Sequence, residues 1–255
     1  MIDSAVLPRI RNGVCAIGYL TVPLPDYIKY HEIPGHFEVI GTGFLVRETT
    51  VLTNAHVIND LRTEQRKNRV PDAQLFLSFV VPRKNGPRGI TVRLIRHMGF
   101  VQQPRIDVGF IEFAIMHPEH FEDIAPLNVD DAFGVEISEH VGVFGYPHGS
   151  ALSEKDGRLR WGPVLQQGWV SGVSPYEGAG SVDEILLDVR AEHGMSGSPI
   201  FRPSSGSVVG ILQSGIRTKP ADERFGTTTA FGQPVDRKIL SNWLAGYDLE
   251  RERGF

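Results

Sequence analysis

Short apolar segments separated by glycine and proline run through the whole chain and limit the folds that it can adopt. The 255 residues include 28 glycines and 17 prolines. Segments of this kind are typical of β-strands joined by turns, whereas a parallel α/β fold needs a crossover of about a dozen residues, usually a helix, between strands. The pattern therefore predicts an all-β chain forming one large domain or two small ones.

The candidate strands fall into two groups of six, and six strands are enough to close a small barrel. The first group is Val14 to Val22, Phe37 to Val46, Thr50 to Thr53, Leu75 to Val81, Ile90 to Arg96 and Val108 to Ala114. The second is His140 to Gly145, Leu165 to Val173, Glu184 to Val189, Ser198 to Phe201, Val208 to Gln213 and Thr227 to Phe231. Between them, His117 to Pro126 holds prolines and acids but no apolar strand. We therefore divide the chain into residues 1–120 and 121–255.

Two segments suggest helical structure. Asn59 to Arg69 is polar with little periodicity, so we expect a helical turn followed by a solvated loop. Near the C-terminus, apolar residues recur at helical spacing within Arg237 to Tyr247, and Asp236 precedes them as a plausible N-cap. We therefore expect a C-terminal α-helix.

Three residues carry the side chains that nucleophilic catalysis needs. Ser196 lies in the glycine-rich segment Gly194 to Pro199, His56 follows an apolar strand, and Asp107 opens another. A serine hydroxyl is a weak nucleophile near neutral pH and needs a base, and imidazole titrates in that range. A carboxylate behind the ring fixes the useful tautomer and stabilises the imidazolium. We therefore assign Ser196 as nucleophile, His56 as base and Asp107 as the group that orients it.

The order of these residues along the chain, histidine then aspartate then serine, distinguishes between the known classes of serine hydrolase. Subtilisin-type chains place the aspartate before the histidine, and α/β-hydrolases place the serine first. On these motifs the chain resembles the chymotrypsin and trypsin-like serine peptidase superfamily, and Gly41 to Val46, Gly145 to Pro147 and Val209 to Ile211 extend the resemblance over nearly its whole length. The resemblance implies two six-stranded antiparallel β-barrels, a C-terminal helix that packs on the second barrel, and a site between the barrels. It also implies a serine endopeptidase that needs no cofactor.

Details of the motifs point to one branch and away from another. Thr-Asn-Ala-His and Gly-Ser-Pro-Ile-Phe are most similar to the bacterial branch that contains glutamyl endopeptidases and HtrA peptidases. We expect no appended peptide-binding domain of the HtrA kind. Secreted trypsins have an aspartate before the nucleophile that pairs with a new amino terminus, but this chain has Met195. That ion pair cannot form. Activation by that route is therefore not expected, and any regulation is expected to come from loops, oligomers or a separate protein partner.

The resemblance also assigns residues that would contact the reaction intermediate and the substrate. The backbone amides of Gly194 and Ser196 would form the oxyanion hole, where glycine leaves the amides accessible. The expected substrate-binding residues are Arg190, His193, Gln213, Ser214, Gly215 and Thr228. Within this set, Ser214 and Gly215 would pair with the substrate backbone as an added β-strand.

Substrate preference stays open between several interpretations. Arg190 could attract an acidic residue, or it could face solvent or pair with Glu192. Thr228, where many relatives have glycine, would narrow the pocket and favour a small or medium apolar residue. His193 could contact substrate or be an ordinary exposed loop histidine. Gln213 stands where trypsins commonly have a serine that supports the catalytic aspartate, so that support is weaker here.

Composition bounds the remaining function classes. A formal net charge of −4 and no basic stripe give no general attraction to nucleic acid or anionic membranes. No apolar run approaches the roughly 20 residues of a membrane helix. A group of metal-binding residue types lacks the spacing of zinc helices, so we predict no metal site; its members are His117, Glu119, His120 and Glu122. Cys15 is the only cysteine and is expected to be buried.

The sequence also suggests where the protein is located and which activities are alternatives to peptide cleavage. With one cysteine no disulfide can form within the chain, and no signal-peptide core is evident, so we expect a cytoplasmic protein. Besides a peptidase acting on peptides or proteins, a catalytically silent or partner-activated binding module on the same fold is possible. An esterase or a viral-type processing peptidase would use the same residues. Labelling with a serine-reactive probe separates an active enzyme from a silent module. Turnover of peptide against ester substrates separates a peptidase from an esterase, and self-cleavage from a precursor would indicate a viral-type processing peptidase.

Overall fold

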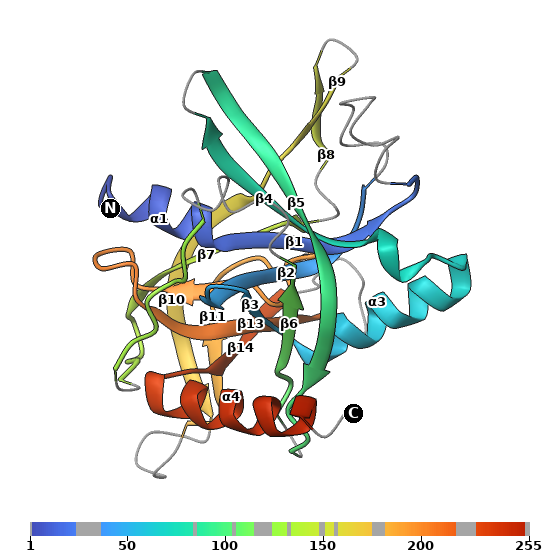
Figure 1. Ribbon diagram of the computed structural model, residues 1–255. Helices are drawn as coiled ribbons and strands as arrows, with labels where there is room; N and C mark the ends of the chain where they lie inside the picture. The colour runs from blue at the N-terminus through green and yellow to red at the C-terminus, as the bar shows by residue number, and fades with distance from the viewer. Residues whose placement is uncertain are drawn as a thin grey trace.

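The structure is a computed structural model of the chain (Figure 1). It describes residues 2–23, 37–83, 86–103, 106–114, 124–131, 134–147, 151–155, 158–174, 182–217 and 228–252. The predicted boundary between the two halves, at residues 120 and 121, lies outside these ranges. Across the described residues, none of the helices is long and apolar enough to span a membrane.

The first closed barrel is built from strands in the order β1-β2-β3-β6-β5-β4. These are β1 (Val14–Leu20), β2 (Phe37–Arg47), β3 (Thr50–Thr53), β4 (Leu75–Arg83), β5 (Gly86–Phe100) and β6 (Gly109–Phe113). Both faces of β1 are buried: Cys15, Ile17 and Tyr19 point into the barrel core, and Val14, Ala16 and Leu20 join the core shared with the second barrel. This explains why β1 reads as a continuous apolar run.

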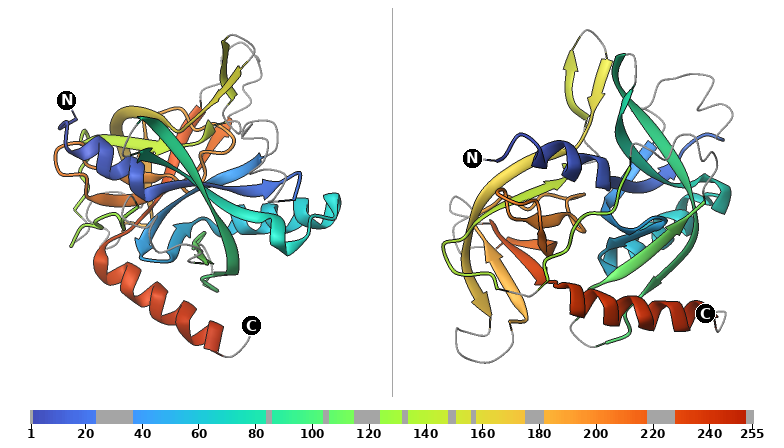
Figure 2. Two further views of the ribbon diagram at one scale, coloured as in Figure 1. Left: turned by 45° about the horizontal axis from the view of Figure 1, so that its top comes forward. Right: turned by 60° about the vertical axis from the view of Figure 1, so that its left-hand side comes forward.

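The second closed barrel has the strand order β10-β11-β14-β13-β12-β7. These are β7 (His140–Gly145), β10 (Val164–Ser174), β11 (Glu184–Leu187), β12 (Pro199–Phe201), β13 (Val208–Arg217) and β14 (Thr228–Pro234). A separate two-stranded sheet, β8 (Ala151–Lys155) with β9 (Arg158–Trp161), was not predicted. Figure 2 shows the two barrels side by side. The predicted all-β fold of two six-stranded antiparallel barrels is confirmed.

The largest buried apolar cluster draws its members from both barrels and both terminal helices, and it includes Phe44 and Phe110 from the first barrel and Phe144 and Phe201 from the second. Since this cluster lies between the barrels, it fixes their relative position and the line along which residues from the two halves can meet. Each barrel also has an apolar core of its own.

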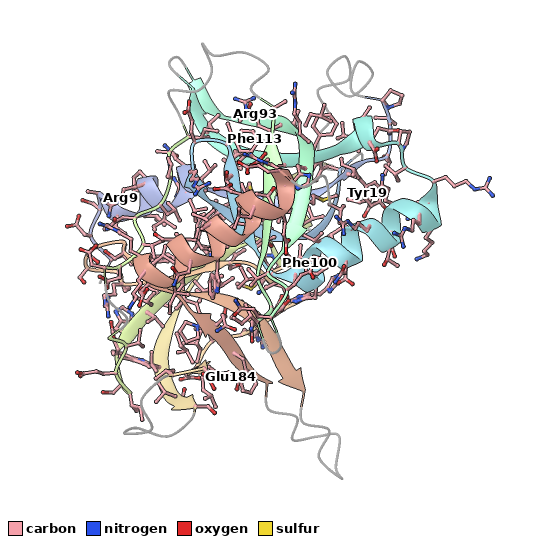
Figure 3. The ribbon with its side chains drawn as sticks, turned by 60° about the horizontal axis from the view of Figure 1, so that its bottom comes forward. Arg9, Tyr19, Arg93, Phe100, Phe113 and Glu184 are labelled. Carbon is pink, nitrogen blue, oxygen red and sulfur yellow. The ribbon has the colours of Figure 1, made fainter. Side chains whose placement is uncertain are left out.

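The C-terminal helix α4 (Arg237–Glu252) confirms the predicted cap, because the backbone N–H of Ile239 donates to Asp236 Oδ1 at 2.7 Å. The helix also contacts the first barrel, which was not predicted. Its first residue is bonded to Asp130, but Tyr247 contacts Phe110 of β6 with ring centroids 5.1 Å apart. Figure 3 shows the helix in front, with the first barrel above it and the second below.

Two helices depart from the sequence-based expectation. Residues expected to form a turn and loop instead belong to α3 (Ala55–Asn68), which buries only Val57, Ile58 and Leu61 and leaves its polar side chains exposed or half-buried. Three apolar residues in the first two turns are enough to dock a helix whose other face is solvated. The short helix α1 (Val6–Gly13) was missed, and it packs Val6 and Ile10 into the core between the barrels.

Candidate active site

His56 is held at the start of a helix by the strand that precedes it. β3 ends at Thr53 and α3 begins at Ala55, so His56 lies in the first helical turn. Asn54, between them, is buried, and its Nδ2 donates to the backbone carbonyl of Asp107 at 2.9 Å. This bond ties the start of α3 to the segment before β6. It brings together His56 and Asp107, which are 51 residues apart in sequence.

The carboxylate of Asp107 contacts His56 at two points. Its Oδ1 accepts the backbone N–H of His56 at 2.9 Å, and its Oδ2 lies 2.5 Å from the ring Nδ1. Burial alone would raise the pKa of Asp107, but the hydrogen bond and charge of the His56 ring, with the amides of His56 and Ala55, outweigh it and lower that pKa. An ionised Asp107 bound to Nδ1 leaves Nε2 as the free nitrogen of the ring.

Ser196 lies in the loop between β11 and β12, and backbone bonds fix its position. Its carbonyl accepts the N–H of Thr42 from the first barrel at 2.9 Å. Its hydroxyl donates to the backbone carbonyl of Gln213 in β13 at 2.8 Å. No hydrogen bond joins this hydroxyl to the His56 ring in the described part of the chain.

The backbone on either side of Ser196 adopts conformations that favour glycine. Gly194 has φ +90° and Gly197 has φ +87°, where a side chain would be strained. A Cβ on Gly197 would also lie 2.0 Å from the carbonyl oxygen of Thr42. The N–H groups of Gly194 and Ser196 have no acceptor among the described residues. The two glycines therefore allow the close approach of the nucleophile loop to the first barrel.

Comparison with known proteins gives the family. The sequence model of the trypsin-like peptidase domain matches residues 41–211, which is more than half of the chain and includes His56, Asp107 and Ser196. The chain belongs to the trypsin-like peptidase family. A glutamyl endopeptidase of Staphylococcus epidermidis strain RP62A is 26% identical over 219 residues, covering 85% of this chain and 68% of the relative. A second glutamyl endopeptidase from S. epidermidis is 24% identical, covering 79% and 69%.

A solved structure agrees with the fold. The crystal structure of Deg5 superposes with a TM-score of 0.53 at 16% identity, covering 90% of this chain and 87% of that one. The family match and the glutamyl endopeptidase relatives make this trypsin-like peptidase a serine endopeptidase, that is, a hydrolase. The predicted superfamily and enzyme class are confirmed.

Thr42 of the peptidase connects the two barrels beside the nucleophile, a role that the sequence did not reveal. Its hydroxyl donates to the carbonyl of Gly194 at 2.8 Å and accepts the N–H of Tyr146 at 2.9 Å. Its own carbonyl accepts the Thr53 hydroxyl at 2.7 Å. Thr42 is fully buried, so each of these bonds replaces one that water would otherwise supply. The motif Gly-Thr-Gly before the histidine was its only signal.

The structure describes the side chains of three predicted substrate-binding residues of the peptidase. The side chain of Arg190 is 79% exposed, and its Nη1 lies 3.7 Å from Glu192 Oε1. This is the arrangement expected if Arg190 faces solvent and pairs with Glu192 and does not bind an acidic substrate residue. His193 is also exposed. The side-chain amide of Gln213 donates to Gln233 Oε1 at 3.2 Å rather than supporting Asp107.

The strand residues of this set are described by their backbone alone. Ser214 and Gly215 in β13 pair with Phe231 and Ala230 of β14, and Thr228 opens β14 opposite Arg217. β12 pairs with β13 only as far as Ile211. In the described part of the chain, Ser214 and Gly215 are therefore paired on one side.

Two remaining expectations concern cysteine and metal. Cys15 is buried, as predicted, and burial raises the pKa of its thiol well above the usual value. The histidines considered for metal binding, His117 and His120, lie outside the described residues. Among those that are described, no group of three or more histidine, cysteine or acidic residues could hold a metal ion.

Proposed function

We propose that this peptidase cleaves peptide bonds with His56 as general base and acid, Asp107 as the residue that orients it, and Ser196 as the nucleophile. The observation that carries the proposal is the two-point contact of Asp107 with His56, which fixes both the backbone and the ring of the histidine. An arrangement of this kind leaves Nε2 directed away from the carboxylate, where a base must receive the serine proton.

In the proposed reaction, Ser196 Oγ attacks the substrate carbonyl carbon while its proton passes to His56 Nε2. The carbonyl oxygen becomes negative and accepts hydrogen bonds from the N–H groups of Gly194 and Ser196. The carbon–nitrogen bond then breaks as His56 gives its proton to the departing amine, leaving an ester on Ser196. Water attacks this ester with His56 again accepting a proton. Return of that proton to Ser196 Oγ releases the acid product.

The proposed substrate is an extended peptide that adds to β13. Ser214 and Gly215 support this because their backbone is paired with β14 on one side and follows the point where β12 ends. A peptide bound there would form main-chain hydrogen bonds, as in other cases of β-strand addition. Its scissile bond would then lie close to Ser196, whose hydroxyl already contacts the neighbouring residue Gln213.

A partly latent resting state, in which the free enzyme reacts more slowly than the enzyme with peptide bound, is part of the proposal. The Ser196 hydroxyl donates to the Gln213 carbonyl, so it must turn toward His56 before it can react. Binding of a peptide or of an activating protein partner along β13 would displace this contact. The alternative is a catalytically silent binding module, in which the hydroxyl never reaches His56.

A second candidate concerns substrate preference. The relatives are named glutamyl endopeptidases, and Arg190 is a cation in the segment that leads to Ser196. A peptide-library cleavage profile of the wild type and of Arg190→Ala tests this candidate. Loss of preference for glutamate in Arg190→Ala would support it. Unchanged preference would eliminate Arg190 as the selective residue.

The triad itself is tested by labelling with a fluorophosphonate probe. Wild type should react, and Ser196→Ala and His56→Ala should not. Faster labelling of the wild type after addition of a peptide or a partner would support the partly latent state. Absence of labelling under all of these conditions would favour the silent binding module.

A further inference from the structure

The residue that precedes the nucleophile is anchored in the core of the second barrel. Met195 is fully buried. Its N–H donates to the carbonyl of Glu192 at 3.0 Å, and its own carbonyl accepts the backbone N–H of Ser198 at 3.0 Å and the Ser198 hydroxyl at 2.6 Å. An apolar residue at this position cannot form an ion pair, so other contacts must hold the loop.

One side chain from a distant strand contacts this loop at two places. Gln166 of β10 donates from Nε2 to the sulfur of Met195 at 3.2 Å. Its Oε1 accepts the backbone N–H of Arg190 at 2.9 Å. The two contacts lie five residues apart along the loop, and together they span the segment that leads to Ser196. Gln166 is half-buried, so both bonds are partly shielded from water.

We propose that Gln166 is a positioning residue that holds the nucleophile loop in its reactive shape, and so sets the oxyanion amides of Gly194 and Ser196. The inference rests on the proposed function of Ser196. Gln166 does not touch the reacting atoms. It acts through Arg190 and Met195, which lie on either side of Gly194.

The chemistry of the side chain fits this role. A primary amide offers a donor and an acceptor at the same time, and Gln166 uses each end for a different partner. Glutamate at this position would keep an acceptor for Arg190 but lose the donor to Met195. Leucine would keep most of the volume and lose both bonds. The two substitutions therefore remove the contacts in a graded way.

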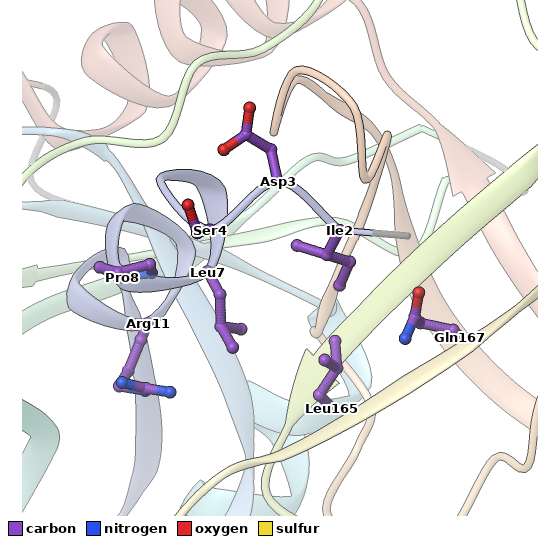
Figure 4. Close-up of a pocket in the computed structure, with 8 residues that line it drawn as sticks. All are labelled: Ile2, Asp3, Ser4, Leu7, Pro8, Arg11, Leu165 and Gln167. Atoms are coloured by element: carbon purple, nitrogen blue, oxygen red, sulfur yellow. The ribbon is translucent and has the colours of Figure 1, made fainter.

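The position of Gln166 is set by the sheet. It pairs with Val143 of β7, and successive residues of a strand point to opposite faces. Its neighbour Gln167 is exposed and lines the groove between α1 and β10 with Leu165, as Figure 4 shows. Gln167 thus provides a matched control on the same strand, away from the nucleophile loop.

The experiment compares Gln166→Leu, Gln166→Glu and the control Gln167→Leu with the wild type. Four quantities are measured: the second-order rate of fluorophosphonate labelling, the acylation rate and burst amplitude with p-nitrophenyl acetate, the unfolding midpoint, and hydrogen exchange of the segment 190–197. We expect Gln166→Leu to lower labelling and acylation rates about 10- to 100-fold, because small displacements of a catalytic group have effects of this size. Gln166→Glu should fall between it and wild type, and Gln167→Leu should match wild type.

A purely structural role would have a different signature. It would lower the unfolding midpoint and the burst amplitude, because fewer molecules would be folded, and would leave the rate of each folded molecule unchanged. We expect instead a full burst, a reduced rate and faster exchange in the segment 190–197. If Gln166→Leu does not fold, the same measurements on Gln166→Glu distinguish a positioning role from a purely structural one.

Two outcomes would overturn the inference. One is a labelling rate of Gln166→Leu within about twofold of wild type. The other is unchanged exchange in the segment 190–197. If the wild type itself reacts with neither reagent, the proposed function fails, and the exchange measurement still shows whether Gln166 holds the loop.

Discussion

The hydroxyl of Ser196 donates to the backbone carbonyl of Gln213 at 2.8 Å. In the proposed mechanism the same proton passes to His56, so this bond must break before attack. A hydrogen bond of this kind contributes about 1 kcal/mol net, which corresponds to about a fivefold change in population. The contact therefore delays the reaction only slightly, and binding along β13 has little to overcome.

Asp107→Asn should reduce turnover by about 1,000- to 10,000-fold while leaving the fold intact. The amide can still accept the backbone N–H of His56 at its oxygen, but its NH₂ group would face Nδ1 and favour the wrong tautomer of the ring. Steady-state hydrolysis of a fluorescent casein measures the effect. A loss of less than tenfold would show that Asp107 does not orient the base.

The lowered pKa of Asp107 makes part of the stability depend on pH. Stability from a carboxylate with a depressed pKa is present above the unfolded-state value of about 4 and disappears as pH falls through the folded-state value. The difference in free energy of unfolding between wild type and Asp107→Asn should therefore shrink as pH falls from 6 to 3. Urea unfolding across this range measures it, and a constant difference would contradict the assigned shift.

Thr42→Val should destabilise the protein by about 2–4 kcal/mol, because the buried carbonyl of Gly194 and the N–H of Tyr146 would lose their partner. For a chain of this size the unfolding midpoint should fall by roughly 5–15 °C. Thr42→Ser keeps the hydroxyl and should lose much less. Equal midpoints for the two variants would show that the hydroxyl bonds contribute nothing.

Met195→Asp should cost about 3–5 kcal/mol, because it would bury an unpaired charge in the core of the second barrel. Met195→Leu, which preserves an apolar side chain of similar size, should cost less than about 1.5 kcal/mol. Denaturant unfolding gives both values. A stable Met195→Asp protein would mean that the site holds a partner for the charge, contrary to the contacts described above.

Most of the fold could be predicted from the sequence, because strands with one or two buried faces leave local apolar patterns. Thr50 to Thr53 and His140 to Gly145 were predicted with the observed bounds. The helix α1 could not be recognised, since it is short, contains Pro8 and buries only Val6 and Ile10 of its apolar residues in the shared core. The helix α3 was shortened because its polar face conceals three buried residues in its first two turns.

The candidate site was predictable only where its residues lie in recognisable segments. His56, Asp107 and Ser196 each have a local context of strand or glycine-rich turn. Gln166 has none, since its partners lie 24 and 29 residues away and meet it only when the second barrel closes. The bond of Ser196 to Gln213 was likewise beyond prediction, because it depends on how β13 passes the nucleophile loop.

The most direct test of the account is the rate at which a fluorophosphonate labels the purified protein, with Ser196→Ala and His56→Ala measured beside it. The probe reacts only with a serine that a base activates and whose oxyanion is stabilised. We predict stoichiometric labelling of wild type and none of either variant, with all three proteins folded by circular dichroism. Labelling that persists in Ser196→Ala, or its absence from folded wild type with and without peptide, would contradict the proposed nucleophile.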